Sequence, residues 1–230
     1  MNYSQRYEKK FFINFTEEKK IKQKFDKIFE LEFGQGYYCF SIYFDDFNLT
    51  TLKQKQEGTM ERFKLRLRSY FFDLKDKPKF WNLEIKAKNN STVRKRKITI
   101  SHLDVLENLK KRNFSFFSSN FHETTRDYFK PTLMTLYFRE AFTSRILPHC
   151  RITFDKNIRC FQYDLKNLDN LNNNNNLVIN PKNILLEFKY TNFLPTFVSN
   201  YFKFLNLDQV TFSKYVDGFE KYKNNYLNEN

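Results

Sequence analysis

The feature that most constrains this chain is a strict alternation of basic and apolar residues in the stretch RFKLRLRSYF, residues 62–71. The basic positions are Arg62, Lys64, Arg66 and Arg68, and the apolar positions between them are Phe63, Leu65 and Leu67. Because successive side chains of a β-strand point to opposite faces, this pattern predicts a strand with one cationic and one apolar face. Like charges on one face repel, so the cationic face needs a partner.

Seven further stretches alternate in the same way or are rich in β-forming residues, and we expect them to be strands: 6–15, 37–46, 79–88, 92–100, 130–142, 150–164 and 184–190. The stretch 150–164 is also compatible with a hairpin that turns at residues 155–157. Asp45, Asp46 and Asp155 are expected to form turns at strand ends.

Helices are predicted between these strands. Thr16 is expected to cap a helix that ends near Gly34, with Ile21, Phe25, Ile28 and Phe29 at helical spacing. Residues 48–58 form a short helix or loop. Ser101 caps a helix over 102–111, with Leu103, Leu106 and Leu109 along one side, and the chain is helical from Pro195. Because strands and helices do not alternate regularly, the sheet is predicted to be mostly antiparallel.

The amino-acid composition narrows the kinds of partner and binding site that the protein can have. The formal net charge of +14 indicates an anionic partner. Only four glycines occur, and neither GxGxxG nor GxxxxGK[ST] is present, which argues against a nucleotide-binding glycine loop.

Three cysteines without a CxxC pair predict free thiols in a reducing compartment. No apolar run approaches the roughly 20 residues that span a bilayer, so we expect a cytoplasmic chain without a membrane segment. Residues 167–183 are Asn-rich and predict a mobile loop inside a single domain, residues 1–230.

The charges point to a chain of phosphates. If the sheet closes into a barrel with its cationic face inward, the lumen must hold water and a polyanion, because burying unpaired charges costs several kcal/mol or more per ion. Arginine forks suit phosphate oxygens. Inward glutamates would hold Mg²⁺ or Mn²⁺, although Glu84 is expected to form a salt bridge.

Eight short motifs carry a resemblance to a known family. They are RYEKKFFI, SIYFDD, RFKLRLRSY, LEIKAK, YFREAF, RITFD, LLEFKY and SKY, in this order, from about residue 5 to 218. The chain resembles the VTC (vacuolar transporter chaperone) domain, a family of the triphosphate tunnel metalloenzymes together with the CYTH proteins. The resemblance implies an α+β fold: a closed antiparallel eight-stranded β-barrel, the triphosphate tunnel, with peripheral helices.

The resemblance also implies site residues. The phosphate-binding cations are Lys10, Arg66, Arg68, Lys86, Arg139 and Arg151, and Glu187 is the metal ligand. Lys214 in SKY is the lysine at the tunnel end, and it joins Arg66 and Arg68 as a catalytic residue. Lys64 and Lys189 are added from the alternation alone, and Arg96 from the run RKRK. The superfamily opens with ExExK, but Arg6 makes this RxExK, which weakens a CYTH-type hydrolase interpretation and leaves Glu8 as a less defined second metal ligand.

Four functions remain open. The first is a metal-dependent polyphosphate polymerase that moves the γ-phosphate of ATP onto a polyphosphate chain, with Mn²⁺ or Mg²⁺ as cofactor. The second is a hydrolase of inorganic triphosphate or polyphosphate in the same tunnel. The third is a polyphosphate-binding module without turnover. A nucleic-acid binder is disfavoured, because the cations alternate with core residues on strands and do not gather in loops or a tail.

Overall fold

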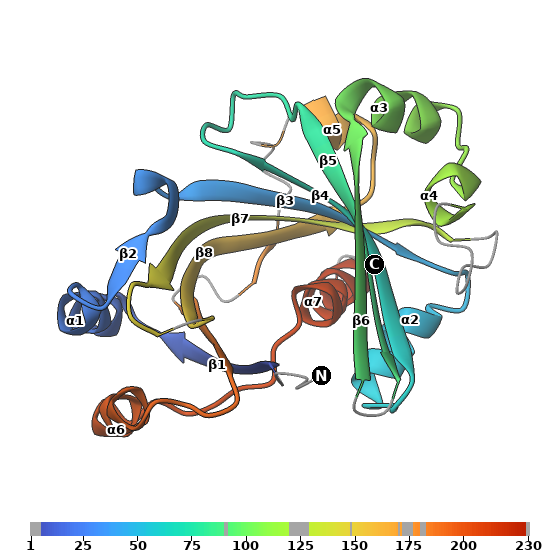
Figure 1. Ribbon diagram of the computed structural model, residues 1–230. Helices are drawn as coiled ribbons and strands as arrows, with labels where there is room; N and C mark the ends of the chain where they lie inside the picture. The colour runs from blue at the N-terminus through green and yellow to red at the C-terminus, as the bar shows by residue number, and fades with distance from the viewer. Residues whose placement is uncertain are drawn as a thin grey trace. The chain divides into compact units, whose positions relative to one another are not determined.

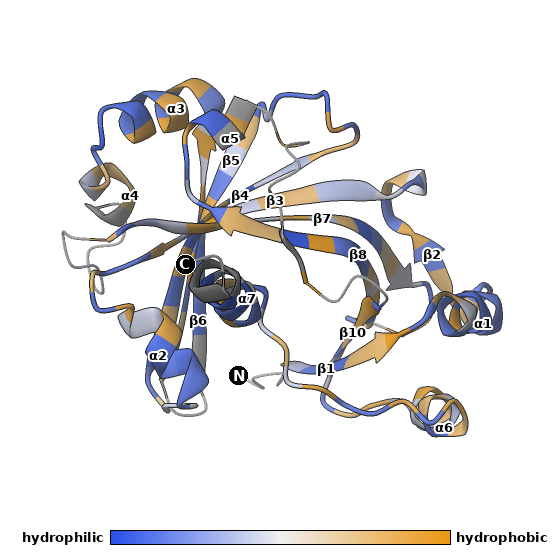
Figure 2. Ribbon diagram, turned by 180° about the vertical axis from the view of Figure 1, so that it is seen from behind, coloured by the Kyte–Doolittle hydropathy of each residue, from blue (hydrophilic) through white to orange (hydrophobic). Residues whose placement is uncertain are grey.

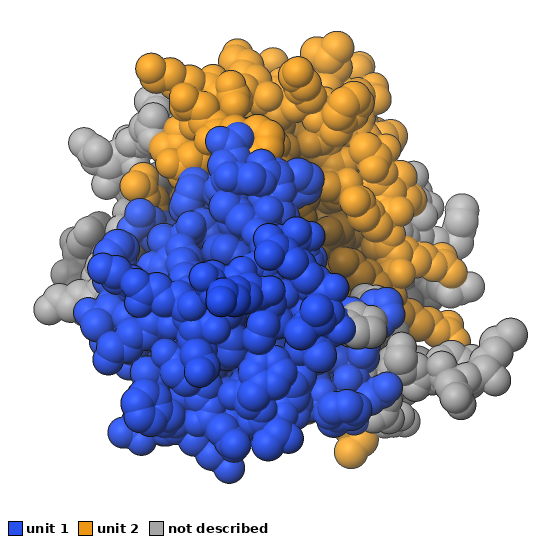
Figure 3. All heavy atoms as spheres, turned by 60° about the vertical axis from the view of Figure 1, so that its left-hand side comes forward, with its two compact units in different colours: residues 1–37, 137–158, 180–212 blue, residues 38–136, 159–179, 213–230 orange. Residues whose placement is uncertain are grey.

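The computed structural model describes residues 6–89, 92–119, 129–147, 149–169, 171, 177–179 and 183–228. The chain divides into two compact units, which are coloured in Figure 3. Unit 1 comprises residues 1–37, 137–158 and 180–212, and unit 2 comprises residues 38–136, 159–179 and 213–230. Strands β7 (Lys130–Ser144) and β8 (Arg151–Gln162) contribute residues to both units.

Unit 1 contains a sheet with helices on its apolar face. Its strands follow the order β1 (Arg6–Ile13), β10 (Ile184–Thr191), β8 and β7, and the short β2 (Phe29–Leu31) pairs with β7. Phe11, Leu186 and Phe154 lie opposite one another across three of these strands. They form a core with Phe25 of α1 (Phe15–Phe25) and Phe202 of α6 (Thr196–Phe204) (Figure 1). The other face of this sheet is therefore free to carry charged residues.

Unit 2 is built in the same way. Its strands are β3 (Tyr37–Asp45), β4 (Arg62–Phe71), β5 (Phe80–Asn89) and β6 (Thr92–Ser101), paired in this order. Leu65 and Ile85 lie opposite each other and share a core with Val105 and Leu109 of α3 (His102–Lys110). The remaining elements are α2 (Thr50–Gln56), α4 (Ser115–Ser119), α5 (Lys166–Asp169), β9 (Leu177–Val178) and α7 (Lys214–Asn228).

The expectation of a mostly antiparallel sheet with a few helices is confirmed. The pairings of β1 with β10, β10 with β8, β2 with β7, and β3 through β6 are all antiparallel. The path of strands begins at β1 and ends at β6. Closure of this path into an eight-stranded barrel stays a prediction.

Helix α1 differs from its prediction at both ends. Its cap is Asn14 and not Thr16: Asn14 Oδ1 accepts from the Glu17 amide, and Glu17 accepts from the Asn14 amide. This reciprocal capping box satisfies two otherwise unpaired amides. The helix ends at Phe25, and Phe29 begins β2. Only a narrow stripe of α1 is apolar, as its mostly hydrophilic colour in Figure 2 shows.

Two further predictions need correction. Strand β8 is continuous, so the hairpin at residues 155–157 is wrong; the chain passes that point with Asn157 at φ 50°, a conformation that Asn tolerates better than most residues. Ser101 does cap α3, but the buried side of that helix is Val105 and Leu109, whereas Leu103 is 77% exposed.

The Asn-rich segment lies partly outside the described residues. Its described parts include α5 and β9, which pairs with β8, and the prediction of a mobile loop is otherwise not tested. The helix predicted from Pro195 is two helices, α6 and α7. Among the described helices, none has the length and apolar character to cross a membrane.

Candidate functional site

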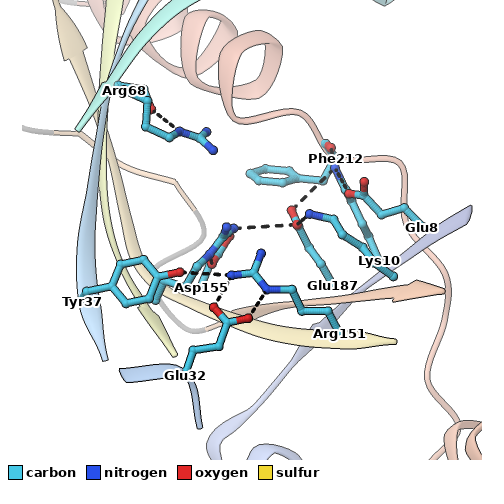
Figure 4. A network of polar contacts seen from close by, with 12 residues as sticks. Glu8, Lys10, Glu32, Tyr37, Arg68, Arg151, Asp155, Glu187 and Phe212 are labelled. Atoms are coloured by element: carbon cyan, nitrogen blue, oxygen red, sulfur yellow. Dashed lines mark hydrogen bonds and ion pairs between the residues drawn. The ribbon is translucent and has the colours of Figure 1, made fainter. Parts of the chain in front are cut away.

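One face of the unit 1 sheet carries charged residues from three strands. Residues directly opposite each other in antiparallel strands point to the same face. Lys10 lies opposite Glu187, and Lys189 lies opposite both Glu8 and Arg151. Figure 4 shows Glu8, Lys10 and Glu187 pointing toward one another, with Arg151 nearby. The structure thus brings together site residues that the sequence could only place on separate strands.

Arg139 is held on this face by a buried ion pair. Its Nε lies 2.6 Å from Asp155 Oδ1, and its Nη2 lies 2.7 Å from Asp155 Oδ2. Asp155 is fully buried and Arg139 is 5% exposed. The expectation that Asp155 forms a turn is wrong, because it lies inside β8. Because the Asp155 carboxylate contacts two nitrogens of the guanidinium, the Arg139 side chain is held in one orientation.

Arg151 has a partner that sequence reasoning missed. Its Nε and Nη2 each lie 2.6 Å from an oxygen of Glu32, and Nη2 also donates to the Tyr37 hydroxyl at 3.2 Å (Figure 4). Glu32 begins the short 3-10 helix η1 (Glu32–Gly34). The sequence pattern assigned Glu32 to the end of a long helix, so nothing pointed to a position opposite Arg151.

Glu187 is the acid around which the unit 1 cations gather. Its oxygens lie 3.3 Å from Lys189 Nζ, 3.8 Å from Lys10 Nζ and 3.8 Å from Arg139 Nη2. Lys10 Nζ also contacts Glu8 at 3.2 Å and donates to the Phe212 carbonyl at 2.8 Å. Burial opposes the charge on Lys10, but Glu187 and Glu8 outweigh it, so the pKa of Lys10 is raised. Lys10 therefore stays protonated at neutral pH.

The carboxylates of this face fit a small divalent ion. Within the described ranges, no three His, Cys, Asp or Glu side chains form a metal-ligating group. Mg²⁺ in phosphate-handling sites needs fewer, since one or two carboxylates act with phosphate oxygens. Glu187 and Glu8 match that smaller set, because both carboxylates contact the same atom, Lys10 Nζ. Hard oxygen donors of this kind suit Mg²⁺ or Mn²⁺.

Unit 2 carries a second charged face, formed by β4, β5 and β6. Its rows follow from the register: Lys64, Lys86 and Lys95; Arg66, Glu84 and Lys97; Arg68, Asn82 and Thr99. The apolar residues of β4 and β5 point the other way, into the core with α3. The alternation in residues 62–68 is therefore the alternation of a sheet with one cationic and one core face, as predicted.

Buried partners hold the two arginines of this face. Nε and Nη2 of Arg66 lie 2.8 Å and 2.6 Å from Glu84 Oε2, which confirms Glu84 as a salt-bridge partner. Burial opposes the charge of Glu84, yet Arg66 and Arg68 prevail and lower its pKa. Arg68 is 8% exposed and donates through Nε to Ser41 Oγ at 3.1 Å. These contacts hold both guanidinium groups on the charged face of unit 2.

Arg96 does not belong to this cationic face. It lies opposite Ile85, whose side chain is part of the core, so Arg96 is on the other face of β6. Successive residues of the run RKRK point to opposite faces of the strand, and the prediction selected a residue on the face that belongs to the core side. Lys95 and Lys97 are the β6 residues in register with Lys86 and Glu84.

Lys214 lies at the start of α7 beside the same face. It is 9% exposed, and the residue before it, Ser213, accepts a hydrogen bond from Lys64 Nζ at 2.8 Å. The Ser213 amide in turn donates to Asp217 Oδ2 at 2.7 Å. These contacts fix the beginning of α7 against β4, which places Lys214 near the strand cations.

Tyr43 is a member of this face that the sequence did not single out. It lies opposite Arg66 on β3, and its ring stacks on Tyr215 with centroids 4.9 Å apart. Burial alone would raise the pKa of Tyr43, but the cations Arg66, Arg68, Lys64 and Lys214 lower it to about 8. Tyr215 donates to Asp45 Oδ2 at 2.6 Å, and Asp45 also accepts from the Thr51 and Leu52 amides. Asp45 and Asp46 thus act at the turn into α2, as expected.

Each unit therefore presents cations and a buried acid on one face of a sheet. In unit 1 these residues are Glu8, Lys10, Arg139, Arg151, Glu187 and Lys189, and in unit 2 they are Lys64, Arg66, Arg68, Glu84, Lys86 and Lys214. Whether all of them face one lumen is a prediction from the sequence that the description of either unit leaves untested.

Two solved structures share this fold at low sequence identity. A candidate adenylate cyclase from Bacillus halodurans matches with a TM-score of 0.52 and 13% identity, covering 90% of this chain and 92% of that protein. A candidate adenylate cyclase from Vibrio parahaemolyticus matches with a TM-score of 0.50 and 14% identity, covering 90% and 94%. At such identities the likeness establishes the fold alone. No curated protein matches the chain.

The family comes from the sequence comparison. The model of the VTC domain matches residues 5–223, which is nearly the whole chain. That span includes both charged faces and all of the short motifs that suggested the resemblance. The chain belongs to the VTC domain family.

Proposed function

We propose that this protein is a metal-dependent phosphotransferase that moves the γ-phosphate of ATP onto a polyphosphate chain. The observation that carries the proposal is the placement of strand cations in both units. Each set lies on one face of an antiparallel sheet, and the opposite face is core. We further propose that the strands close into an eight-stranded tunnel within a single domain, residues 1–230, and that both faces line it.

Phosphate chains match the chemistry of these faces better than other anions. Arg66, Arg139 and Arg151 each use two nitrogens on a carboxylate, which fixes the plane of the guanidinium and aims its other donors. Fixed forks suit oxygens at the regular spacing of linked phosphates. Lysines add charge without such geometric demands.

The residues divide into two roles. Arg66, Arg68 and Lys214 would contact the reacting phosphates, because they gather in one place at the start of α7 and on β4. Lys10, Lys64, Lys86, Arg139, Arg151 and Lys189 would bind the rest of the chain. Holding acceptor and donor in line and offsetting their charge lowers the barrier to transfer without a protein nucleophile. Arg96 has no role in this proposal.

Glu187 and Glu8 would hold the divalent ion. When bound, Mg²⁺ or Mn²⁺ would neutralise charge on the phosphates. Lys10, which touches both acids, would then turn toward a phosphate oxygen. Its raised pKa keeps it cationic for that contact.

The decisive experiment is to incubate the purified protein with ATP and Mn²⁺ and to measure ADP and chain length of the phosphate product. Polyphosphate with one ADP per added phosphate supports the polymerase. Release of free phosphate supports the hydrolase, and binding of triphosphate without turnover supports a binding module. The double variant Arg66→Ala/Arg68→Ala should lose the activity.

A matched control removes the same charge elsewhere. Lys110→Ala/Lys111→Ala alters two exposed lysines at the end of α3, and it should keep the activity. Equal loss in both variants would show that overall charge matters and that the β4 face does not. We also propose a cytoplasmic location, which is supported by three buried cysteines that are thiols and not disulfides in the structure.

A further inference from the structure

Tyr43 stands out in unit 2 because a buried phenol lies on the charged face, directly opposite Arg66. The side chain is 3% exposed. Its backbone carbonyl accepts from Thr132, and its ring stacks on Tyr215 at an interplanar angle of 18°. Because Tyr43 lies opposite Arg66, its side chain is on the face where an anionic ligand would meet the strand cations.

The position of Tyr43 is fixed from both sides. Tyr215, on which it stacks, is anchored through its own hydroxyl to Asp45 at 2.6 Å. Lys64 Nζ lies 6.0 Å from the Tyr215 ring centroid and is tied to Ser213. Tyr43 is paired with Arg66 across β3 and β4. The stacking and the strand pairing together place the phenol beside the cations of β4.

The charges around the phenol are almost all positive. Arg66, Arg68 and Lys64 reach it from β4, and Lys214 reaches it from α7. The acids on neighbouring elements are engaged elsewhere: Glu84 of β5 binds Arg66, and Asp45 at the end of β3 binds Tyr215 and the start of α2.

We propose that Tyr43 is a phosphate-contacting residue that exchanges a proton when the chain of phosphates binds. Without ligand, the phenol loses its proton to solvent at mildly alkaline pH, and the phenolate serves as an internal anion for the four cations. When a phosphate chain arrives, the phenolate takes one proton from solvent and donates it as a hydrogen bond to a phosphate oxygen. Deprotonated Tyr43 thus competes with the ligand, and protonated Tyr43 assists it. This inference rests on the proposed function.

The sign of the pH effect follows from linkage. The cations bring the pKa of Tyr43 down to about 8, against an ordinary value near 10. A bound polyanion cancels part of the positive potential, so the pKa rises in the complex. Between these two pKa values, binding takes up a fraction of a proton, approaching about one proton per ligand. Triphosphate affinity should therefore fall above about pH 8, by up to about tenfold per pH unit beyond what Tyr43→Phe shows.

The test uses inorganic triphosphate as the probe and reads Tyr43 directly. The near-ultraviolet absorbance of tyrosinate is titrated in the wild type, in Tyr43→Phe and in Tyr163→Phe, with and without triphosphate. We expect one tyrosinate to form near pH 8 in the wild type and in Tyr163→Phe, to be absent in Tyr43→Phe, and to disappear when triphosphate is added. Tyr163 is the matched control, because burial raises its pKa to about 12.

Calorimetry in buffers of different ionisation enthalpy gives the proton count at about pH 9. The wild type should take up more protons per triphosphate than Tyr43→Phe, whose affinity at pH 7 should be within about fivefold of the wild type, the loss of one hydrogen bond. If Tyr43→Phe does not fold, Lys64→Gln serves instead, since removing one cation should move the early tyrosinate titration to higher pH.

The outcomes separate the two proposals. If triphosphate binds at pH 7 but proton uptake is equal in the wild type and Tyr43→Phe, the role of Tyr43 is overturned and the proposed function stands. If no early tyrosinate forms in the ligand-free wild type, the role is also overturned. If triphosphate fails to bind at any pH, both the proposed function and the role of Tyr43 fall.

Discussion

The Arg139–Asp155 pair is the most enclosed ionic contact that unit 1 contributes to the candidate site. Both side chains are nearly or fully buried, and two nitrogen–oxygen contacts below 3 Å join them. Asp155→Asn should cost about 3 kcal/mol of unfolding free energy, because it removes the carboxylate that contacts two nitrogens of the buried guanidinium and leaves Glu187, 3.8 Å away, as the nearby acid. Denaturant unfolding measures this loss.

An exposed pair supplies the control. Glu107 and Lys111 form an i,i+4 contact on α3, with side chains 59% and 68% exposed. Glu107→Gln should change the free energy of unfolding by about 0.5 kcal/mol or less. Similar losses for the two variants would mean that the Arg139–Asp155 pair is not buried in solution.

Glu187 and Glu140 offer a second comparison at the residue scale. Glu187→Gln removes the acid shared by Lys10, Arg139 and Lys189, so metal-dependent turnover should be lost while triphosphate binding without metal becomes tighter. Glu140→Gln alters the residue beside Arg139 whose contacts are instead Lys22 and Lys156, and its metal dependence should be unchanged. Activity assayed against Mn²⁺ concentration, with triphosphate binding in parallel, decides the matter; unchanged metal dependence in Glu187→Gln would remove Glu187 from the metal role.

The alternation in the sequence could indicate which cations share one face of a strand, but it could not identify the residues that they contact. Arg66, Arg68 and Lys64 follow from alternation, because a strand permits only two faces. Glu32 and Asp155 could not be recognised, since each meets its arginine through a contact between segments far apart in the chain. Arg96 shows the limit of this reasoning, because a run of four basic residues places cations on both faces of the strand.

At the scale of elements, helix α1 allows a sharp test of capping. Asn14→Ala removes the side-chain oxygen that accepts from the Glu17 amide, which is one half of the capping box, and should cost about 1 kcal/mol of unfolding free energy. Thr16→Ala changes the exposed residue two positions later, which the sequence pattern had favoured as the cap, and should cost much less. Chemical denaturation of both variants measures the difference; a larger loss for Thr16→Ala would place the cap where the sequence suggested.

Strands were predicted more accurately than helix ends, and the reason is physical. A two-residue period repeats several times within ten residues, so β4, β5 and β6 could be found within about two residues of their bounds. The end of α1 depends on whether Phe29 packs on a helix or pairs with Ser144, which is a long-range contact. Strand β8 likewise runs unbroken through Asn157, where the sequence was also compatible with a hairpin turn.

For the whole molecule, the net charge of +14 predicts how ligands affect stability. Triphosphate at about 100 times its Kd should add about 2.7 kcal/mol to the free energy of unfolding, which raises Tm by roughly 5–10 °C in a chain of this size. Sulfate at equal charge concentration should raise it far less, because linked phosphates meet several fixed cations at once. A thermal melt compares the two directly.

The same melt includes two controls. Single-stranded DNA should shift Tm less than triphosphate and with a steeper salt dependence. Arg66→Ala/Arg68→Ala should lose most of the triphosphate effect. If triphosphate does no more than sulfate, the cations do not form a site for phosphate chains.

The antiparallel character and the order of elements could be predicted, because the motifs run in sequence along nearly the whole chain. The division into two compact units could not, since β7 and β8 each pass from one unit to the other without a change in their composition.

The three buried cysteines can report how often the parts of the chain around them open. Cys39 and Cys160 are fully buried and Cys150 is 7% exposed, and burial raises the pKa of Cys160 to about 12. A thiol reagent should therefore modify them only during transient opening, so that each modification rate reports a local opening equilibrium. Cys150 reports on unit 1, and Cys39 and Cys160 report on unit 2. Mass spectrometry after timed labelling, with and without triphosphate, would reveal whether the ligand lowers the cysteine modification rates in both units or in one unit alone.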